Sequence, residues 1–162
     1  MAISTAFYIV VAMIAFAANS LLCRMALADG LIDPTSFTFI RLASGAFTLS
    51  LLLIVKKRNA LNGGSWSGAI ALFIYAAGFS FAYVSMSTGT GALLLFGAVQ
   101  LTMLLWGYYK GEIFTPLQCA GFVVAISGLI ILLFPGLSSP PLLAASVMIL
   151  AGVGWGAYSI MG

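Results

Sequence analysis

The chain has 162 residues, of which 63% are hydrophobic and only 6% are charged, and it contains no histidine. An ordinary soluble domain carries about 25% charged residues, so this composition excludes a soluble fold. Long uncharged stretches match the roughly 20 apolar residues that a helix needs to cross a bilayer, and they predict an integral membrane protein.

Hydropathy and helix-breaking residues predict six transmembrane helices, at residues 4–28, 36–55, 67–87, 91–109, 117–134 and 142–161. Backbone groups inside lipid must be hydrogen-bonded within a helix or a closed barrel, and these runs are too long and too uniformly apolar for barrel strands. We therefore expect an all-α membrane protein, a polytopic bundle of these helices.

The first span carries two polar side chains, Asn19 and Arg24. Asn19 lies deep enough to need a partner, which is either another helix or a ligand. Arg24 lies near the end of the span, so its head can extend to the outer interface, close to Asp29. The span lacks a basic leader and exceeds the usual length of a signal peptide, so we expect a retained helix.

The second span contains Arg41, which lies about five residues, hence roughly 8 Å, inside its predicted start. Thr38 and Ser44 share its helical face. A charge at this depth usually faces the bundle interior or a watery cavity. One interpretation is a cationic group facing a cavity that opens to the outer side. The other is that Arg41 extends outward and pairs with Asp29 or Asp33.

The third span carries a stripe of small and hydroxyl-bearing residues that includes Tyr83. Such a stripe suits a polar cavity and close helix packing equally well. Residues 88–91, Thr-Gly-Thr-Gly, are expected to form a tight glycine turn into the fourth span. Gln100 falls near the midpoint of that span, where secondary transporters tend to bind substrate. The residues that we expect to line a substrate-binding cavity are Asn19, Arg41, Tyr83 and Gln100.

Basic residues between the spans define the expected orientation. The loops after the second and fourth spans are the basic ones, carrying Lys56, Lys57, Arg58 and Lys110. Lys and Arg are enriched in cytoplasmic loops, so these loops and both termini are expected in the cytoplasm.

Few residues of this sequence could act in catalysis. Without histidine there is no Ser-His-Asp or Cys-His arrangement and no imidazole metal ligand, and the three carboxylates lie in predicted loops. No glycine-rich segment has the Lys-Ser/Thr ending of a phosphate-binding loop. We therefore expect no enzyme activity, no catalytic residues, no metal, no cofactor and no nucleic-acid partner.

The segment 89–132 resembles the closing part of an EamA repeat in the drug/metabolite transporter superfamily. That pattern has a small-residue turn into the fourth helix, a Gly-Glu loop, a Gln-x-x-Gly entry to the fifth helix and a later glycine. The first two spans are also similar to the family. The residues that carry the resemblance are Asn19, Arg24, Asp33-Pro34, Arg41-Leu42, Gly111-Glu112, Gln118, Gly121 and Gly128.

The resemblance implies the first half of a ten-helix inverted-repeat transporter in a bacterial plasma (inner) membrane. Residues 1–135 would form the first five-helix repeat, and residues 136–162 would begin a second repeat that is truncated. The implied function is secondary transport, as a permease or exporter of small metabolites or drug-like molecules, by alternating access. The alternative is a non-transporting membrane scaffold or assembly subunit. A genuine half-size protein would need to self-associate to build both halves of the pathway.

Overall fold

The described residues form six helices that match the predicted spans closely. The structure, a computed structural model, describes residues 2–28, 30–56, 64–133 and 140–161. The helices are α1 (Ala2–Ala28), α2 (Pro34–Val55), α3 (Trp66–Tyr83), α4 (Thr88–Tyr109), α5 (Pro116–Leu133) and α6 (Leu142–Met161). No strand occurs in the described part of the chain, and the prediction of an all-α membrane protein is confirmed.

Length and composition allow five of these helices to cross a membrane, namely α1, α2, α3, α4 and α6. In α5 the described side chains form a further apolar stretch over Pro116–Gly128. Many large apolar side chains on the outside of the bundle are exposed, for example Phe47 at 72% and Ile131 at 75%. In a bilayer such side chains contact lipid tails, so their exposure fits the predicted apolar surroundings.

Side chains in the loops cap the starts of three helices. The Asp33 carboxylate accepts a hydrogen bond of 2.9 Å from the Ser36 N–H, and Pro34 opens α2. Hydrogen bonding from the Ser36 side chain, and then from its backbone N–H, lowers the pKa of the exposed Asp33 carboxyl. Ser65 caps α3 and Ser87 caps α4 in the same way. These caps satisfy N–H groups that have no partner inside their own helix.

The predicted glycine turn between the third and fourth spans was wrong in its position. Helix α3 already ends at Tyr83, and α4 already begins at Thr88, so residues 88–91 form the first turn of α4. Gly91 is needed there for close packing: a Cβ atom added to it would lie 2.5 Å from Cε1 of Tyr83. The glycine therefore makes room for an aromatic ring and does not reverse the chain.

The end of α4 has the hydrogen bonds of a Schellman motif. Gly111 donates its N–H to the Tyr108 carbonyl at 2.9 Å, and Glu112 donates to the Gly107 carbonyl at 3.0 Å. Gly111 has a φ of +89°, which favours glycine over other residues. The Gly-Glu pair of the sequence pattern thus ends a helix and turns the chain toward α5.

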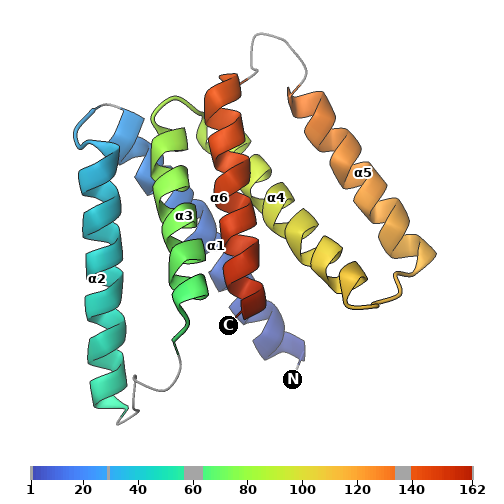
Figure 1. The fold of residues 1–162 in the computed structure, drawn as a ribbon, viewed down its shortest axis with the longest axis horizontal. Coiled ribbons are helices and arrows are strands. Elements are labelled where there is room, and N and C mark those ends of the chain that lie inside the picture. Colours follow the sequence, from blue (N-terminus) through green and yellow to red (C-terminus); the bar gives the residue numbers. More distant parts are fainter. Residues whose placement is uncertain (1, 29, 57–63, 134–139, 162) are drawn as a thin grey trace.

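Helix α6 is the central element of the bundle. It packs against α3 on one side and α4 on the other, and these are the two most extensive helix contacts (Figure 1). Helix α2 lies beside α3 at one edge, and α5 lies at the opposite edge. Both chain ends lie at the same side of the bundle as the end of α2 and the end of α4 (Figure 1).

Small residues allow α6 to approach both neighbours closely. A Cβ atom added to Gly152 would lie 2.7 Å from the Leu95 carbonyl oxygen on α4. One added to Gly154 would lie 2.9 Å from the Ala71 carbonyl oxygen on α3. Side chains at these positions would separate the backbones, so the glycines permit the close approach of α6 to both neighbours.

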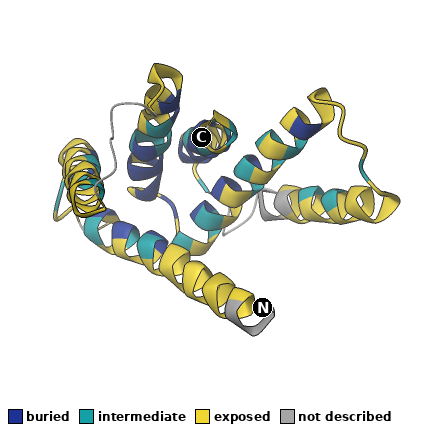
Figure 2. Cartoon of the chain, turned by 90° about the horizontal axis from the view of Figure 1, so that it is seen from below, coloured by how far each residue is buried: buried dark blue, intermediate teal, exposed yellow. Residues whose placement is uncertain are grey.

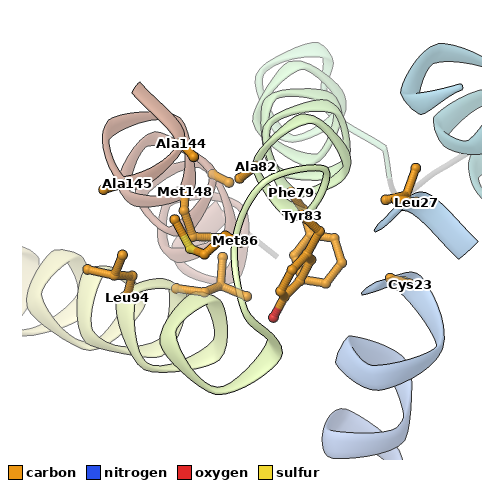
Figure 3. Packing of buried hydrophobic residues seen from close by; sticks show 12 residues of the cluster. Cys23, Leu27, Phe79, Ala82, Tyr83, Met86, Leu94, Ala144, Ala145 and Met148 are labelled. Atoms are coloured by element: carbon orange, nitrogen blue, oxygen red, sulfur yellow. The ribbon is translucent and has the colours of Figure 1, made fainter. Parts of the chain in front are cut away.

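The core lies where the ends of α1 and α3 meet the starts of α4 and α6 (Figure 3). Helices α3 and α6 carry most of the buried positions, while α2 and α5 are mainly exposed (Figure 2). The buried cluster comprises Cys23, Leu27, Phe79, Ala82, Tyr83, Met86, Leu94, Leu95, Ala144, Ala145, Met148 and Ala151.

Candidate functional site

Arg41 connects α2 to α3 inside the bundle. It follows the first residue of α2, Pro34, by seven positions, which is about 10 Å along a helix. Its Nη2 donates a hydrogen bond of 2.8 Å to the Tyr75 hydroxyl. Its Cζ lies 4.6 Å from the ring centre of Phe79 and 5.3 Å from that of Tyr75. Each such cation–π contact stabilises by about 0.5–2 kcal/mol, depending on how dry it is.

The other terminal nitrogen of Arg41, Nη1, is buried and has no hydrogen-bond partner. The pairing considered for Asp33 is not present, because that carboxylate caps α2 and is exposed. Asp29, the other candidate, lies outside the described residues. A buried donor without a partner costs about 1–3 kcal/mol, and more for a charged group. The guanidinium is therefore held in place by two rings and a hydroxyl while one end remains unsatisfied.

An aromatic cluster extends from Arg41 across the bundle; we define it as Phe16, Tyr75, Phe79, Phe96 and Trp155. The ring of Tyr75 lies 5.1 Å from that of Trp155 on α6. Trp155 in turn lies 5.4 Å from Phe16 on α1 and 5.7 Å from Phe96 on α4. These spacings are those of mutually stabilising aromatic pairs. Five helices thus contribute to one continuous site of a guanidinium and rings.

Tyr83 lies in the packed core next to this cluster. Its ring is fully buried and makes an edge contact with Phe79 at 4.6 Å (Figure 3). Its hydroxyl donates to the Thr88 carbonyl at 3.3 Å. Asn19 is partly buried on α1, where its Oδ1 accepts a weak hydrogen bond of 3.8 Å from the Cys23 thiol. Both polar groups therefore face partners inside the protein.

Arg24 holds α1 against the end of α3. Its Nη1 donates to the carbonyl oxygens of Tyr83 at 2.6 Å and Val84 at 2.8 Å. These are the last carbonyls of α3, which carry the negative end of the helix dipole. Arg24 was expected to extend to the outer interface close to Asp29, which lies outside the described residues; the structure shows its guanidinium capping the end of α3.

Gln100 lies one helical turn after Phe96 on α4 and is exposed in this chain. Together with Phe96 of the aromatic cluster it lines a cavity of about 420 Å³ between α4 and α5. It also borders a second cavity of about 420 Å³, which is lined by Glu112 and Ser159. Arg41 and Tyr83 both lie against Phe79 on α3, at the other end of the aromatic cluster from Phe96.

The site combines one guanidinium with several apolar ring faces. Within the described residues no group of His, Cys, Asp or Glu could hold a metal ion. Arg41 offers charged N–H donors, and the cluster offers apolar faces, so the site can hold an anionic or carbonyl group beside an apolar body.

The sequence analysis did not identify Tyr75 as a partner of Arg41. Tyr75 lies one helical turn before Phe79, and neither residue was singled out. Trp155 in the last span was not singled out either. Their contacts with Arg41 and with each other join residues far apart in sequence, and a helical period carries no signal for such contacts.

Comparison with known proteins gives a family match over most of the chain. The EamA-like transporter family matches residues 3–134. An uncharacterized protein of Pseudomonas aeruginosa is 54% identical over 154 residues, which cover 94% of this chain and 54% of that protein. An uncharacterized transporter of Archaeoglobus fulgidus is 28% identical over 142 residues, covering 81% of this chain and 48% of its own length. The chain thus spans about half the length of these curated relatives. No solved structure matches it.

Proposed function

This chain belongs to the EamA-like transporter family, and from that premise we propose that it forms the substrate pathway of a secondary transporter for small metabolites or drug-like molecules. Transport proceeds by alternating access, in which two repeats rock around a central binding site. The observation that supports this most is Arg41, a charged side chain well inside a membrane helix with one terminal nitrogen unpaired. Such residues usually mark a substrate or ion pathway.

The proposed polar residues of the pathway are Asn19, Arg41, Tyr83 and Gln100. Arg41 and the aromatic cluster lie where five helices converge. Tyr83 is fully buried in this conformation, so α1 or α4 must move before a substrate can touch its hydroxyl. Gln100 lines one cavity together with Phe96 of the aromatic cluster and a second cavity beside α6, so it would meet substrate at that end of the cluster.

Residues 1–135 form the first repeat in this proposal, and residues 136–162 begin the second. The family match over residues 3–134 and the double length of the relatives support this division. Helix α6 would then be the first element of the second repeat, packed between α3 and α4 of the first. An odd number of helices per repeat inverts the second copy, which gives the inverted repeat common in alternating-access transporters.

The proposed location is a bacterial plasma membrane with the N-terminus in the cytoplasm. Lys56 and Lys110 cap the ends of α2 and α4, which lie at the same side as both chain ends (Figure 1). The positive-inside rule assigns that side to the cytoplasm.

Uptake by vesicles tests the proposal. The full-length two-repeat protein would be reconstituted into liposomes and offered a labelled mixture of amino acids, nucleosides, sugars and organic acids. We expect saturable uptake of some component above empty vesicles. Arg41→Lys and Gln100→Leu should reduce that uptake while insertion and thermal stability stay near wild type, because pathway residues touch substrate and not the fold.

Two control variants make the same Arg→Lys and Gln→Leu changes at positions outside the proposed pathway. Arg24→Lys alters a guanidinium that caps α3, and Gln118→Leu alters an amide that accepts hydrogen bonds from Thr115 at the start of α5. Both should change stability more than transport. If uptake and stability fall in parallel for Arg41 and Gln100 as well, these residues serve packing and their assignment to the pathway is wrong. If the wild-type protein shows no saturable uptake, the scaffold alternative replaces the transporter.

A further inference from the structure

We infer that Arg41 anchors a site for an organic monocarboxylate with an apolar body, and this inference rests on the proposed function because it names the substrate class of the same site. The anchor is the buried Nη1 of Arg41, which has no hydrogen-bond partner. The body of the ligand lies along the aromatic cluster that begins at Tyr75 and reaches Phe16 and Phe96.

The charge balance of the bundle interior selects an anion. Among the described residues, Arg24 and Arg41 are the charged side chains that contact α3, and both are cationic. The described carboxylates are committed elsewhere: Asp33 caps α2, and Glu112 lies against Gly107 near the opposite end of the bundle. An anion that reaches Nη1 therefore meets an uncompensated positive charge in surroundings of low polarity, where the attraction is strong.

The guanidinium geometry favours a carboxylate over other anions. A guanidinium presents its N–H groups as a planar fork, which matches the two oxygens of a carboxylate. Nη2 donates one of its two N–H groups to the Tyr75 hydroxyl, which positions the fork and leaves the other N–H of Nη2 and those of Nη1 for the ligand. A doubly charged phosphate would need further cations, and Arg24 is occupied by the carbonyls at the end of α3.

The aromatic cluster selects the body of the ligand. Tyr75 and Phe79 already hold a cation, the Arg41 guanidinium, so the rings are not free to act as a cage for a cationic substrate. Trp155 continues the apolar surface from Tyr75 toward Phe16 and Phe96, whose side chains are 40% and 38% exposed. An aromatic or aliphatic body can enter from that end and stack on Trp155.

Two sources could place a carboxylate at Nη1 of Arg41. One is a small molecule, and the other is an Asp or Glu side chain of a longer, two-repeat protein. We commit to the small molecule. The probe is 3-phenylpropionate, with 3-phenylpropionamide as the neutral match and acetate as the match without an apolar body. Binding to the purified 162-residue chain in detergent would be measured by calorimetry and by the fluorescence of Trp155, with Trp66 and Trp106 replaced by Phe.

We expect 3-phenylpropionate to bind saturably and at least tenfold tighter than either matched compound. Arg41→Gln should abolish the preference for the acid over the amide, whereas Arg24→Gln should retain it. Tyr75→Phe keeps the ring and frees Nη2, so it should preserve the preference for the acid. Circular dichroism confirms that each variant is folded. Equal binding of acid and amide, or wild-type binding by folded Arg41→Gln, would overturn the inference.

A second arm separates the sources and the two proposals. Binding of 3-phenylpropionate by the 162-residue chain but not by the two-repeat protein would assign the carboxylate to the protein itself, and the ligand inference would fall. Transport of neutral solutes without acid binding would refute the ligand inference but support the proposed function. Acid binding by both proteins without any transport would support the ligand inference but refute the proposed function.

Discussion

The contact between α4 and α6 predicts a specific cost for one added methyl group. In Gly152→Ala the new Cβ would lie 2.5 Å from the Ala98 Cβ and 2.7 Å from the Leu95 carbonyl oxygen. Ordinary contacts between such atoms begin near about 3.5 Å. One obstacle is backbone and the other is attached directly to it, so no side-chain rotation relieves the clash and the two helices must move apart.

The magnitude follows from two opposing effects. Overpacking of a filled interior costs about 1–3 kcal/mol. Alanine is favoured over glycine within a helix by up to about 1 kcal/mol, which offsets part of this. We therefore expect a net loss of about 1–2 kcal/mol, a change of about 5- to 30-fold in the unfolding equilibrium.

Reversible unfolding in mixed micelles of mild detergent and dodecyl sulfate, followed by circular dichroism, measures this loss. Gly45→Ala on α2 is the matched control, because a Cβ atom at Gly45 would meet nothing within 4 Å. That variant should be unchanged or more stable by up to about 1 kcal/mol. If Gly152→Ala is as stable as Gly45→Ala, the close approach of α4 and α6 is not as described.

Three further predictions address the helix ends and the topology. Ser87→Ala removes the cap of α4 and should lower the free energy of unfolding by about 1 kcal/mol in the same assay. Arg24→Gln removes charge-assisted hydrogen bonds to the end of α3 and should cost about 1.5–3 kcal/mol, with faster amide exchange there as a second readout. In a cysteine-free background, Leu31→Cys and Ile113→Cys, which are 78% and 94% exposed, should react with impermeant maleimide from opposite sides of the membrane; labelling of both from one side would refute the six-span topology.

The sequence predicted which segments become helices because hydropathy adds up along contiguous residues. A helix in lipid needs about 20 of them, and every run of that length became a helix in the structure. Boundaries were weaker where local chemistry competes: Ser87, assigned to the third span, is the cap of the fourth helix. A hydroxyl at a span end can serve packing or capping, and the residue type alone does not decide between them.

The sequence likewise predicted one part of the candidate site and missed another. The depth of Arg41 follows from its place in an apolar run, so the sequence could single it out as a membrane-embedded charge. The partners of Arg41 could not be predicted in that way. Tyr75 lies 34 positions further along the chain, and it contacts Arg41 because α2 packs against α3. Likewise Tyr83 and Gln100 looked equivalent as polar groups in apolar helices, yet one is fully buried and the other exposed.

The sequence by itself determined that the surroundings are lipid, which segments are helical, and that a charge lies within the membrane. Each of these depends on a single residue or on neighbours along the chain. Tertiary structure alone decided which faces of the helices meet. Gly152 and Gly154 let α6 sit between α3 and α4, and that position brings Trp155 against Tyr75. Lipid is as apolar as the helix surfaces, so hydropathy does not choose the contacting face, and the fit of small residues against backbone does.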